Sequence, residues 1–313
     1  MKPKIFIDGR EGTTGLQIYE RLGKRDDIEL LLIDESKRKD ISERKRMINS
    51  ADVVFLCLPD EAARQSVALV ENDSTRIIDA STAHRTDPDW IYGLPELSAE
   101  QRAMIAKARF VANPGCHATG FIISVYPLIA LGILPPDYPL ACFSPTGYSG
   151  GGKSMIADYE ERKNEGMSAP GLYALELKHK HLPEIMAVAG LKRTPVFCPF
   201  VDDYYRGMAT SLALHNDMLG GKPTAADIRR MLADYYSGQC FVTVAPELGS
   251  GTLYCNWGAG TNDLELTVSG NETQTLVTAR FDNLGKGASG AAVQNMNIML
   301  GLPETKGLES TNA

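Results

Sequence analysis

The sequence predicts an α/β fold in two domains. At 313 residues, the chain is long for a single hydrophobic core. Its first third alternates short apolar strands with helical segments, which is typical of a parallel sheet with helices on both faces. From about Leu140 onward, the strand segments become longer and richer in Thr, Val and Phe. We expect this second region to be an α+β domain with a mostly antiparallel sheet.

The first domain is expected to alternate strands and helices from its start. A helix is predicted at 16–25 from the spacing of its apolar residues, and a second at 60–71, where Asp60 is placed to cap it. Because the strand segments are short and apolar, they are predicted to be buried on both faces of the sheet. The expected strands are 4–9, 28–34, 51–59, 75–81 and 108–115.

The second region begins with a helix predicted at 117–132 and ends with a helical pattern at 284–304. Between them, Leu264, Leu266 and Val268 alternate with polar residues, as in an antiparallel strand with one solvated face. The strands expected here are 140–152, 193–201, 207–215, 240–246 and 263–270. The chain has no low-complexity linker, so we interpret the second domain as an insertion into the first.

Composition excludes several classes of protein. A net charge of −7 argues against a nucleic-acid partner, which favours a basic face. No apolar run approaches the ~18 residues of a membrane helix, and the N-terminus lacks the apolar region of a signal peptide. No cysteine belongs to a C-x-x-C pair, so zinc and disulfide frameworks have little support, and we expect no metal and a cytoplasmic location. The cysteines are Cys57, Cys116, Cys142, Cys198, Cys240 and Cys255.

The turn after the first strand, DGREGTTGLQ, has the spacing of a dinucleotide-binding turn. Gly9, Gly12 and Gly15 fit the three needs of such a turn: a tight bend, a close approach to a pyrophosphate, and close packing of helix on strand. Thr13 and Thr14 begin the helix, whose free N–H groups would face the phosphates. The alternative is a plain glycine-rich turn. With a strand before it and a helix behind it, the pattern favours a Rossmann domain.

The end of the second strand, IDESKRKD, bears on the choice of cofactor. Asp34 suits a ribose hydroxyl and hence NAD. Ser36, Lys37 and Arg38 follow at once and suit a 2′-phosphate, hence NADP. A solvated charged loop is the other interpretation. The segment leans to NADP (NADPH).

Cys116, in FVANPGCHATGF, stands out from the other cysteines. It follows a strand and a Pro-Gly turn and comes directly before the predicted helix at 117–132. The positive end of a helix dipole favours the thiolate form, and ligands bind at the carboxyl ends of parallel strands. The five remaining cysteines lie in or beside apolar segments and are expected to be buried filler. On local context alone, Cys116 is either such a filler or a nucleophile.

A nucleophilic thiolate needs a partner that handles protons, and the HKHLPEI segment offers one. In a strand, His179 and His181 would share a face and could enter one pocket, and Pro183 argues against a helix at that point. The alternative is a pair of solvent-facing histidines in a charged loop. We favour an acid/base role for one of the two and prefer His179, although the spacing does not distinguish His179 from His181.

Four segments together, NPGCHATG, HKHLPEI, DASTAHR and GKGASGAAVQNMNIMLGL, resemble the N-acetyl-gamma-glutamyl-phosphate reductase family of arginine biosynthesis, in its compact form. The resemblance covers nearly the whole chain. It implies an NADP-binding Rossmann domain at 1–115 and 286–313, and a catalytic and oligomerisation domain at 116–285 like that of aspartate-semialdehyde and glyceraldehyde-phosphate dehydrogenases. It also implies a homodimer or homotetramer that acts on a small acyl phosphate.

The resemblance implies a mechanism and further site residues. Cys116 would form a thioester with the acyl group of N-acetyl-glutamyl phosphate, and NADPH would reduce it to the semialdehyde. Arg85 would face the substrate. The glycine-rich segment Ser149–Lys153, with Ser149 and Gly150 as substrate-binding candidates, is expected from its composition to close over cofactor or substrate. Asn295 would hydrogen-bond the nicotinamide carboxamide. His117 departs from the aromatic residue that commonly follows the family's nucleophile.

Two alternatives remain open at this stage. One is aspartate-semialdehyde dehydrogenase, which uses the same thioester chemistry on a smaller acyl phosphate. The H-x-H-x-P-E-I segment tips the choice away from it. The other is a protein without catalysis that binds NADP and senses redox state through Cys116.

Overall fold

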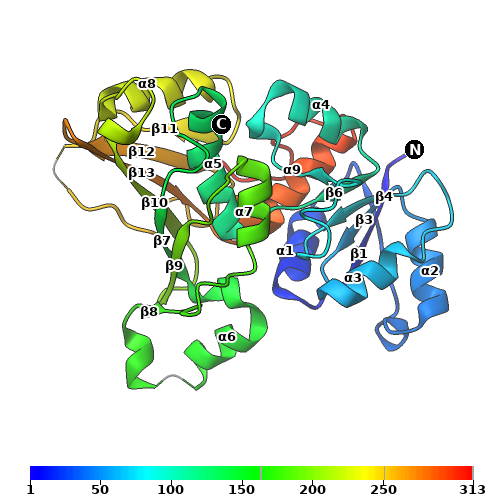
Figure 1. The fold of residues 1–313 in the computed structure, drawn as a ribbon. Helices are drawn as coiled ribbons and strands as arrows, with labels where there is room; N and C mark the ends of the chain where they lie inside the picture. The colour runs from blue at the N-terminus through cyan, green and yellow to red at the C-terminus, as the bar shows by residue number, and fades with distance from the viewer. Residues whose placement is uncertain (163, 250, 312–313) are drawn as a thin grey trace. The chain divides into compact units, whose positions relative to one another are not determined.

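The computed structural model describes residues 1–162, 164–249 and 251–311. It divides into two compact units, which are described separately (Figure 1). The first unit is Met1–Pro114 with Ala288–Leu308, and the second is Gly115–Gly287 with the tail from Glu309. The sequence prediction had assigned this tail to the first domain. Instead, Ser310 and Thr311 bind the buried carboxylate of Asp263 in the second unit, with hydrogen bonds of 2.6–2.8 Å.

The first unit contains the expected parallel sheet, with strand order β2-β1-β3-β4-β6-β5 and parallel pairing throughout. Its strands are β1 Lys4–Asp8, β2 Glu29–Leu31, β3 Val53–Leu56, β4 Arg76–Asp79, β5 Ile91–Tyr92 and β6 Phe110–Ala112. Its α-helices are α1 Thr13–Leu22, α2 Ile41–Asn49, α3 Asp60–Val67, α4 Ala99–Lys107 and α9 Gly290–Met299. Helices α2 and α4 and the short β5 were not anticipated from the sequence.

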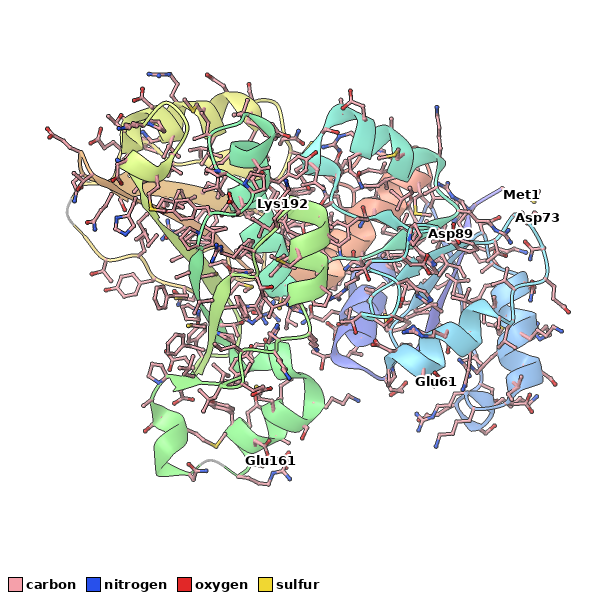
Figure 2. The ribbon with its side chains drawn as sticks, in the orientation of Figure 1. Met1, Glu61, Asp73, Asp89, Glu161 and Lys192 are labelled. Atoms are coloured by element: carbon pink, nitrogen blue, oxygen red, sulfur yellow. The ribbon has the colours of Figure 1, made fainter. Side chains whose placement is uncertain are left out.

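Both faces of this sheet are buried, as the continuous apolar strands predict. Ile5 and Ile7 of β1 belong to a core with residues of α1, α4 and α9. Phe6, between them, points to the opposite face and packs with residues of α2 and α3. Figure 1 shows the two groups of helices on either side of the strands. Charged side chains such as Glu61 of α3 project from the outer surface (Figure 2).

The second unit contains a mixed sheet with strand order β11-β12-β13-β10-β7-β9-β8. Its pairs are antiparallel except β11 with β12 and β7 with β9, so the mostly antiparallel sheet is confirmed. Its strands are β7 Ala141–Gly147, β8 Gly171–Leu172, β9 Val196–Asp202, β10 Met208–His215, β11 Val242–Val244, β12 Leu264–Gly270 and β13 Gln274–Phe281. Its α-helices are α5 Cys116–Ala130, α6 Gly152–Glu160, α7 Leu182–Ala189 and α8 Ala225–Tyr235.

The two faces of this sheet differ. Helix α5 packs so tightly on the inner face that a side chain at Gly120 would come within 2.6 Å of Thr210 Oγ1. On the outer face, Phe143 of β7, Val196 of β9 and Leu276 of β13 are exposed, at 47%, 49% and 37%. They share that face because Phe143 pairs with Ser211 of β10, and Ser211 pairs in turn with β13.

Candidate functional site

The glycine turn of the first unit has the geometry that a dinucleotide-binding turn requires. Gly9 has φ +88°, and a side chain there would overlap the carbonyl of Cys57. A side chain at Gly15 would overlap the carbonyl of Gly9, so helix α1 can approach β1 only with glycine at this position. Gly12 stands as the N-cap of α1 without a side-chain cap, which leaves the helix N-terminus open to an anion.

Thr13 adds a second sign of a ligand at this turn. It is the first residue of α1, and its Oγ1 atom is buried without a hydrogen-bond partner among the described residues. Buried hydroxyls are rarely left unsatisfied. A phosphate oxygen at the helix N-terminus would supply the partner, so the turn fits a dinucleotide. Thr14 follows it in the first turn of α1.

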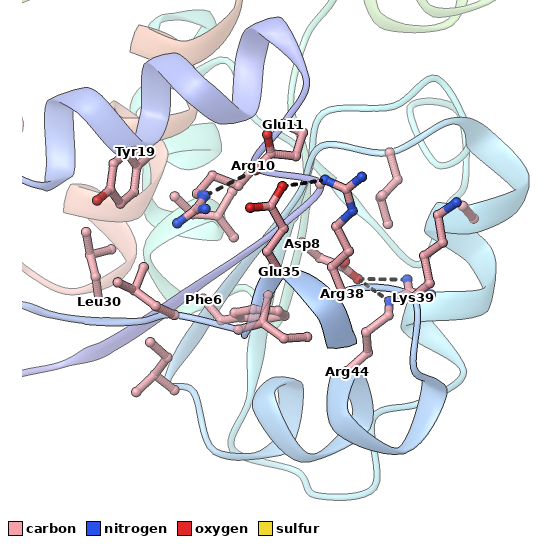
Figure 3. Close-up of a pocket in the computed structure, with 17 residues that line it drawn as sticks. Phe6, Asp8, Arg10, Glu11, Tyr19, Leu30, Glu35, Arg38, Lys39 and Arg44 are labelled. Atoms are coloured by element: carbon pink, nitrogen blue, oxygen red, sulfur yellow. Dashed lines mark hydrogen bonds and ion pairs between the residues drawn. The ribbon is translucent and has the colours of Figure 1, made fainter.

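A pocket of about 340 Å³ adjoins the glycine turn (Figure 3), a size within the usual range of ligand sites. Its charged lining is largely paired: Arg38 lies 3.4 Å from Glu35, and Arg44 lies 2.8 Å from Asp8. Lys39 has no ion-pair partner within the described part of the chain. The charged residues of the lining are Asp8, Arg10, Glu11, Glu35, Arg38, Lys39 and Arg44.

Only some of the residues proposed from IDESKRKD line the pocket. Arg38 lines the pocket, but Ser36 and Lys37 are outside the lining. The carboxylate of Asp34 instead accepts hydrogen bonds from the backbone N–H and the hydroxyl of Ser36, at 2.9 and 2.6 Å. These bonds lower the pKa of Asp34 and form a local cap, which sequence spacing alone does not reveal.

Three basic residues of the pocket, Arg10, Lys39 and Arg44, were missed by the sequence analysis. Arg44 lies in helix α2, which was itself not anticipated. Arg10 lies inside the glycine turn, directly after Gly9, and Lys39 directly follows Arg38. A signal was present for Arg10 and Lys39, because each is a basic residue adjacent to a predicted phosphate-binding segment.

Asn295 is fully buried in α9 of the first unit. Its Nδ2 donates to the carbonyl of Gly93 at 2.9 Å and to Asn113 Oδ1 at 3.2 Å. Its own Oδ1 has no partner among the described residues. An amide side chain fixed at its nitrogen and open at its oxygen can accept a hydrogen bond from a carboxamide NH₂.

Arg85 follows β4 in the first unit and has a structural role, because its guanidinium donates hydrogen bonds to backbone carbonyls. Its Nε donates to the carbonyl of Asn113 at 3.0 Å, and one terminal nitrogen donates to the carbonyl of Ala80 at 3.1 Å. These bonds tie the loops after β6 and β4 together. A direct role in binding substrate is a proposal.

In the second unit, Cys116 is the first residue of α5, one residue before the helix start expected from the sequence. The N-cap is Gly115, whose backbone N–H donates to the buried carboxylate of Glu184 at 3.1 Å. A side chain at Gly287 would lie 2.9 Å from Cys116 Cβ, so the backbone at Gly287 passes close beside the nucleophile candidate.

Three histidines gather in this unit. The ring centroids of His179 and His181 are 4.7 Å apart, and His117 lies 5.4 Å from the first and 5.8 Å from the second. The expectation that His179 and His181 lie on a strand was wrong, because both lie in a loop and turn before α7. The expectation that Pro183 argues against a helix was also wrong, because Pro183 stands in the first turn of α7, where a missing N–H costs nothing.

His117 is a member of this cluster, which the sequence analysis did not anticipate. It is 2% exposed, with Nδ1 2.6 Å from Ser144 Oγ and Nε2 2.9 Å from the hydroxyl of Tyr173. Burial, with a smaller effect of His179 and Lys180, lowers the pKa of His117 to about 3. This histidine is therefore neutral at physiological pH.

His179 is half-buried, and burial followed by the charge of Lys180 lowers its pKa to about 4. Its Nδ1 lies 3.2 Å from the backbone nitrogen of His181, which donates to it. A neutral ring that accepts at Nδ1 carries its proton on Nε2. His179 therefore presents an N–H donor on its other side.

Ser149 and Gly150 lie in a short 3₁₀ turn, Tyr148–Gly151, rather than in an open loop. Ser149 is buried, its N–H donates to the carbonyl of Tyr205, and its hydroxyl accepts from Asn283 Nδ2 at 3.0 Å. Gly150 faces the same amide, since a side chain there would lie 3.4 Å from Asn283 Nδ2. The turn is braced, so a flexible closing role has no support in these contacts.

The remaining cysteines differ among themselves. Burial raises the pKa of the thiols of Cys57 and Cys142, which suits inert core residues. Cys240 is exposed, contrary to the expectation of buried filler. Within the described residues, His, Cys, Asp and Glu side chains form no group that could hold a metal ion, and no helix is long and apolar enough to cross a membrane.

Comparison with known families divides the chain in two. Residues 4–105 match the NAD binding domain of semialdehyde dehydrogenases, and residues 116–283 match the semialdehyde dehydrogenase dimerisation domain. The first unit is thus of a type that binds a nicotinamide dinucleotide.

Among curated proteins, the chain is similar to N-acetyl-gamma-glutamyl-phosphate reductases. It is 51% identical to reductase 2 of Nostoc sp., over 98% of this chain and 99% of that protein. It is 48% identical to the reductase of Brucella ovis, over 96% and 100%, and 47% identical to reductase 2 of Pseudomonas putida, over 97% and 99%.

Solved structures with the same fold include aspartate semialdehyde dehydrogenase II of Vibrio cholerae complexed with ASA. It has a TM-score of 0.74 and 14% identity, and the match covers 96% of this chain and 98% of that chain. Aspartate semialdehyde dehydrogenase of Francisella tularensis has a TM-score of 0.71 and 15% identity, covering 96% and 100%.

Proposed function

Since the chain belongs to the N-acetyl-gamma-glutamyl-phosphate reductase family, we propose that it reduces N-acetyl-glutamyl 5-phosphate to N-acetyl-glutamate 5-semialdehyde and phosphate, with NADPH, in arginine biosynthesis. The observation that carries this proposal is Cys116 at the first turn of α5, in the unit where three histidines gather. The compartment we propose is the cytoplasm, where scattered thiols stay reduced.

In the first half of the reaction, the Cys116 thiolate adds to the acyl carbon of the substrate. The carbon–oxygen bond to the phosphate then breaks, a carbon–sulfur bond remains, and the phosphate leaves with a proton from solvent. The start of α5 favours the thiolate through its dipole. Glu184 fixes this helix start by accepting the backbone N–H of Gly115.

In the second half, the thioester on Cys116 is reduced to a thiohemiacetal, which collapses to the semialdehyde and frees the thiolate. The nicotinamide cofactor, when bound, supplies the hydride for this reduction. His179 is the residue we assign to the substrate oxygen, because its Nε2 carries a proton while Nδ1 is engaged. As general acid, it donates its Nε2 proton to the oxygen when the thiohemiacetal forms. As general base, it takes the proton back when the thiohemiacetal breaks down. His181 is more buried and occupies the N-cap position of α7 without a side-chain cap hydrogen bond.

NADP, rather than NAD, is the cofactor we assign to the pocket of the first unit. Lys39 is free to meet a 2′-phosphate, and Arg38 is held only by an exposed ion pair with Glu35. Exposed pairs of this kind contribute little, so a phosphate can take the place of Glu35. Gly9, Gly12, Thr13, Thr14 and Gly15 would hold the pyrophosphate.

Other roles in the site are proposals of the same kind. Asn295 would accept a hydrogen bond from the nicotinamide carboxamide at its open Oδ1, which supports its assignment. Arg85 would bind the charged groups of the substrate through its guanidinium. Ser149 and Gly150 would line the substrate site as a rigid backbone segment rather than as a loop that closes over it.

We also propose that the protein forms a homodimer or homotetramer. The second unit matches a dimerisation domain, and its sheet exposes Phe143, Val196 and Leu276 on the outer face. A sheet face with several exposed apolar side chains is an expected site of self-association.

One assay separates this function from its alternatives. The purified protein is incubated with NADP, phosphate and either N-acetylglutamate semialdehyde or aspartate semialdehyde, and NADPH absorbance is followed. Activity on the N-acetylated substrate alone is the expected result. Activity on aspartate semialdehyde alone would favour the second candidate, whose solved structures share the fold at 14–15% identity. Binding of NADP with activity on neither would favour a redox sensor.

A further inference from the structure

The hydrogen bonds around His117 form one continuous relay, which we define as Thr210, Ser144, His117 and Tyr173. Thr210 Oγ1 of β10 lies 3.0 Å from Ser144 Oγ of the neighbouring strand β7. Ser144 Oγ lies 2.6 Å from Nδ1 of His117, and Nε2 of the same ring lies 2.9 Å from the hydroxyl of Tyr173. The relay therefore runs from the interior of the sheet to a half-buried phenol.

The buried end of the relay fixes the direction of its hydrogen bonds. Thr210 is completely buried, and Ser144 is the one hydrogen-bond partner of its hydroxyl among the described residues. If Ser144 donated to Thr210, the hydroxyl hydrogen of Thr210 would be a buried donor without an acceptor. A buried donor left unpaired is costly, whereas an oxygen with a spare lone pair is not. Thr210 therefore donates to Ser144.

This direction sets the tautomer of His117. Since Ser144 accepts from Thr210, its own hydrogen goes to Nδ1 of His117, which must be bare. The neutral ring then carries its proton on Nε2 and donates it to the oxygen of Tyr173. The hydroxyl hydrogen of Tyr173 is the one donor of the relay that makes no hydrogen bond within it.

Tyr173 presents this spare donor near Cys116. Burial, and next the negative charge of Cys116, raise the pKa of the Tyr173 phenol, so it stays protonated beside the nucleophile. The ring of Tyr173 also lies beside that of His179, with centroids 5.9 Å apart. His117, whose Nε2 bonds the phenol, directly follows Cys116 at the start of α5, so the phenol lies close to the helix turn that carries the sulfur.

We propose that Tyr173 is a further catalytic residue, which donates a hydrogen bond to the oxygen of the acyl group bound to Cys116, and that Thr210, Ser144 and His117 position it. This inference rests on the proposed function. The oxygen becomes negative when the thiolate adds to the acyl carbon and again when hydride adds to the thioester. Tyr173 stabilises that charge without giving up its proton, in the manner of an oxyanion hole.

The test compares four variants in the NADPH-dependent reduction of N-acetyl-glutamyl phosphate. Tyr173→Phe should lower kcat roughly 10²-fold, the usual effect of losing one such donor, with a much smaller change in KM. Thr210→Val, which keeps the shape but removes the hydroxyl, should lower kcat about fivefold, as expected for one hydrogen bond. Thr210→Ser, which keeps the hydroxyl, should have the kcat of the wild type rather than that of Thr210→Val. Thr267→Val, at a buried threonine of β12 outside the relay, should leave it unchanged.

The double variant Tyr173→Phe/Thr210→Val distinguishes a positioning role of Thr210, exerted through Tyr173, from a general effect on the structure. In the Tyr173→Phe background, Thr210→Val should have no further effect on kcat, because the relay then has no donor to orient. Equal effects of Thr210→Val in both backgrounds, a normal kcat for Tyr173→Phe, or failure of Thr210→Ser to rescue would overturn the proposal.

A spectroscopic measurement holds even if Tyr173→Phe or Thr210→Val fails to fold or the substrate is wrong. In protein with ¹⁵N-labelled histidine, the ring shifts of His117, assigned by their loss in His117→Phe, should report a bare Nδ1 and a protonated Nε2. The opposite tautomer would refute the relay. If wild type does not turn over N-acetyl-glutamyl phosphate, the proposed function fails, while the tautomer still tests the relay on its own.

Discussion

The carboxylate of Glu184 in α7 accepts the backbone N–H of Gly115, one residue before Cys116, at 3.1 Å. Glu184 is 1% exposed, so this contact takes place in the interior of the second unit. Helix α7 therefore holds the start of α5 in place. The position of the nucleophile depends on a carboxylate 68 residues further along the chain than Cys116.

Loss of this acceptor should weaken both stability and catalysis. In Glu184→Ala, the buried N–H of Gly115 loses its partner, and we expect a loss of about 1–3 kcal/mol in the free energy of unfolding. Urea denaturation measures this loss, and the rate of Cys116 alkylation by iodoacetamide reports the helix start. Glu184→Gln keeps an acceptor oxygen and should be milder in both measurements. Equal damage from the two variants would show that the negative charge, and not the acceptor, matters.

Lys39→Ala and Arg38→Ala should each raise KM for NADPH about tenfold, an effect of ~1.4 kcal/mol, and change KM for NADH far less. The reason is that both residues line the pocket where a 2′-phosphate would lie. Lys37→Ala is the matched control, since Lys37 is in the same segment but not in the lining, and it should leave both constants alone. A common rise in KM for NADPH and NADH would contradict the assignment of NADP.

Stability should fall as the pH falls below about 6.5, because His117 stays neutral in the folded state. Its pKa is about 3 when folded and ordinary when unfolded, so between these values the unfolded chain binds the extra proton. At pH 5 this favours unfolding by about 2 kcal/mol for one buried histidine.

Urea denaturation at pH 7 and pH 5 measures this difference in the free energy of unfolding. His117→Phe should reduce it, whereas the exposed His215→Asn, at the end of β10, should not. An unchanged difference in His117→Phe would assign the pH dependence to other groups.

Phe143→Lys should dissociate the proposed homo-oligomer. Its side chain is 47% exposed on the outer face of the second sheet, and a lysine there would place charge in an apolar contact. Light scattering should report a lower mass for this variant. Leu16→Lys is the control, because Leu16 is similarly exposed, at 45%, but lies in the first unit. A native mass for Phe143→Lys would exclude this face as the interface.

Much of the fold was predictable because its signals are local. The apolar strands and the glycine turn depend on residues close together in the sequence, and the parallel and mostly antiparallel sheets followed from them. The cap expected at Asp60 was wrong, because Pro59 is the N-cap of α3 and the Asp60 carboxylate instead accepts hydrogen bonds from Thr82. Helices α2, α4, α6, α7 and α8 were missed, as were strands β5, β8 and β13. Helix α4 has apolar residues without a clear stripe, and its burial depends on packing with α9 rather than on its own pattern.

The candidate site was less predictable because its contacts join distant segments. The pattern H-x-H identified His179 and His181 even though the strand expected for them was wrong. The partners of His117 lie 27 and 56 residues away, so no local pattern could show that it bridges Ser144 and Tyr173. For the same reason, the braced turn at Ser149 looked like an open glycine loop.

The most direct test of the central claim is the mass of the protein incubated with N-acetyl-glutamyl phosphate in the absence of NADPH. We expect an acyl adduct on the peptide that contains Cys116, with release of one phosphate per active site, and neither in Cys116→Ser. An adduct on another residue, or turnover by Cys116→Ser at the wild-type rate, would contradict the thioester mechanism.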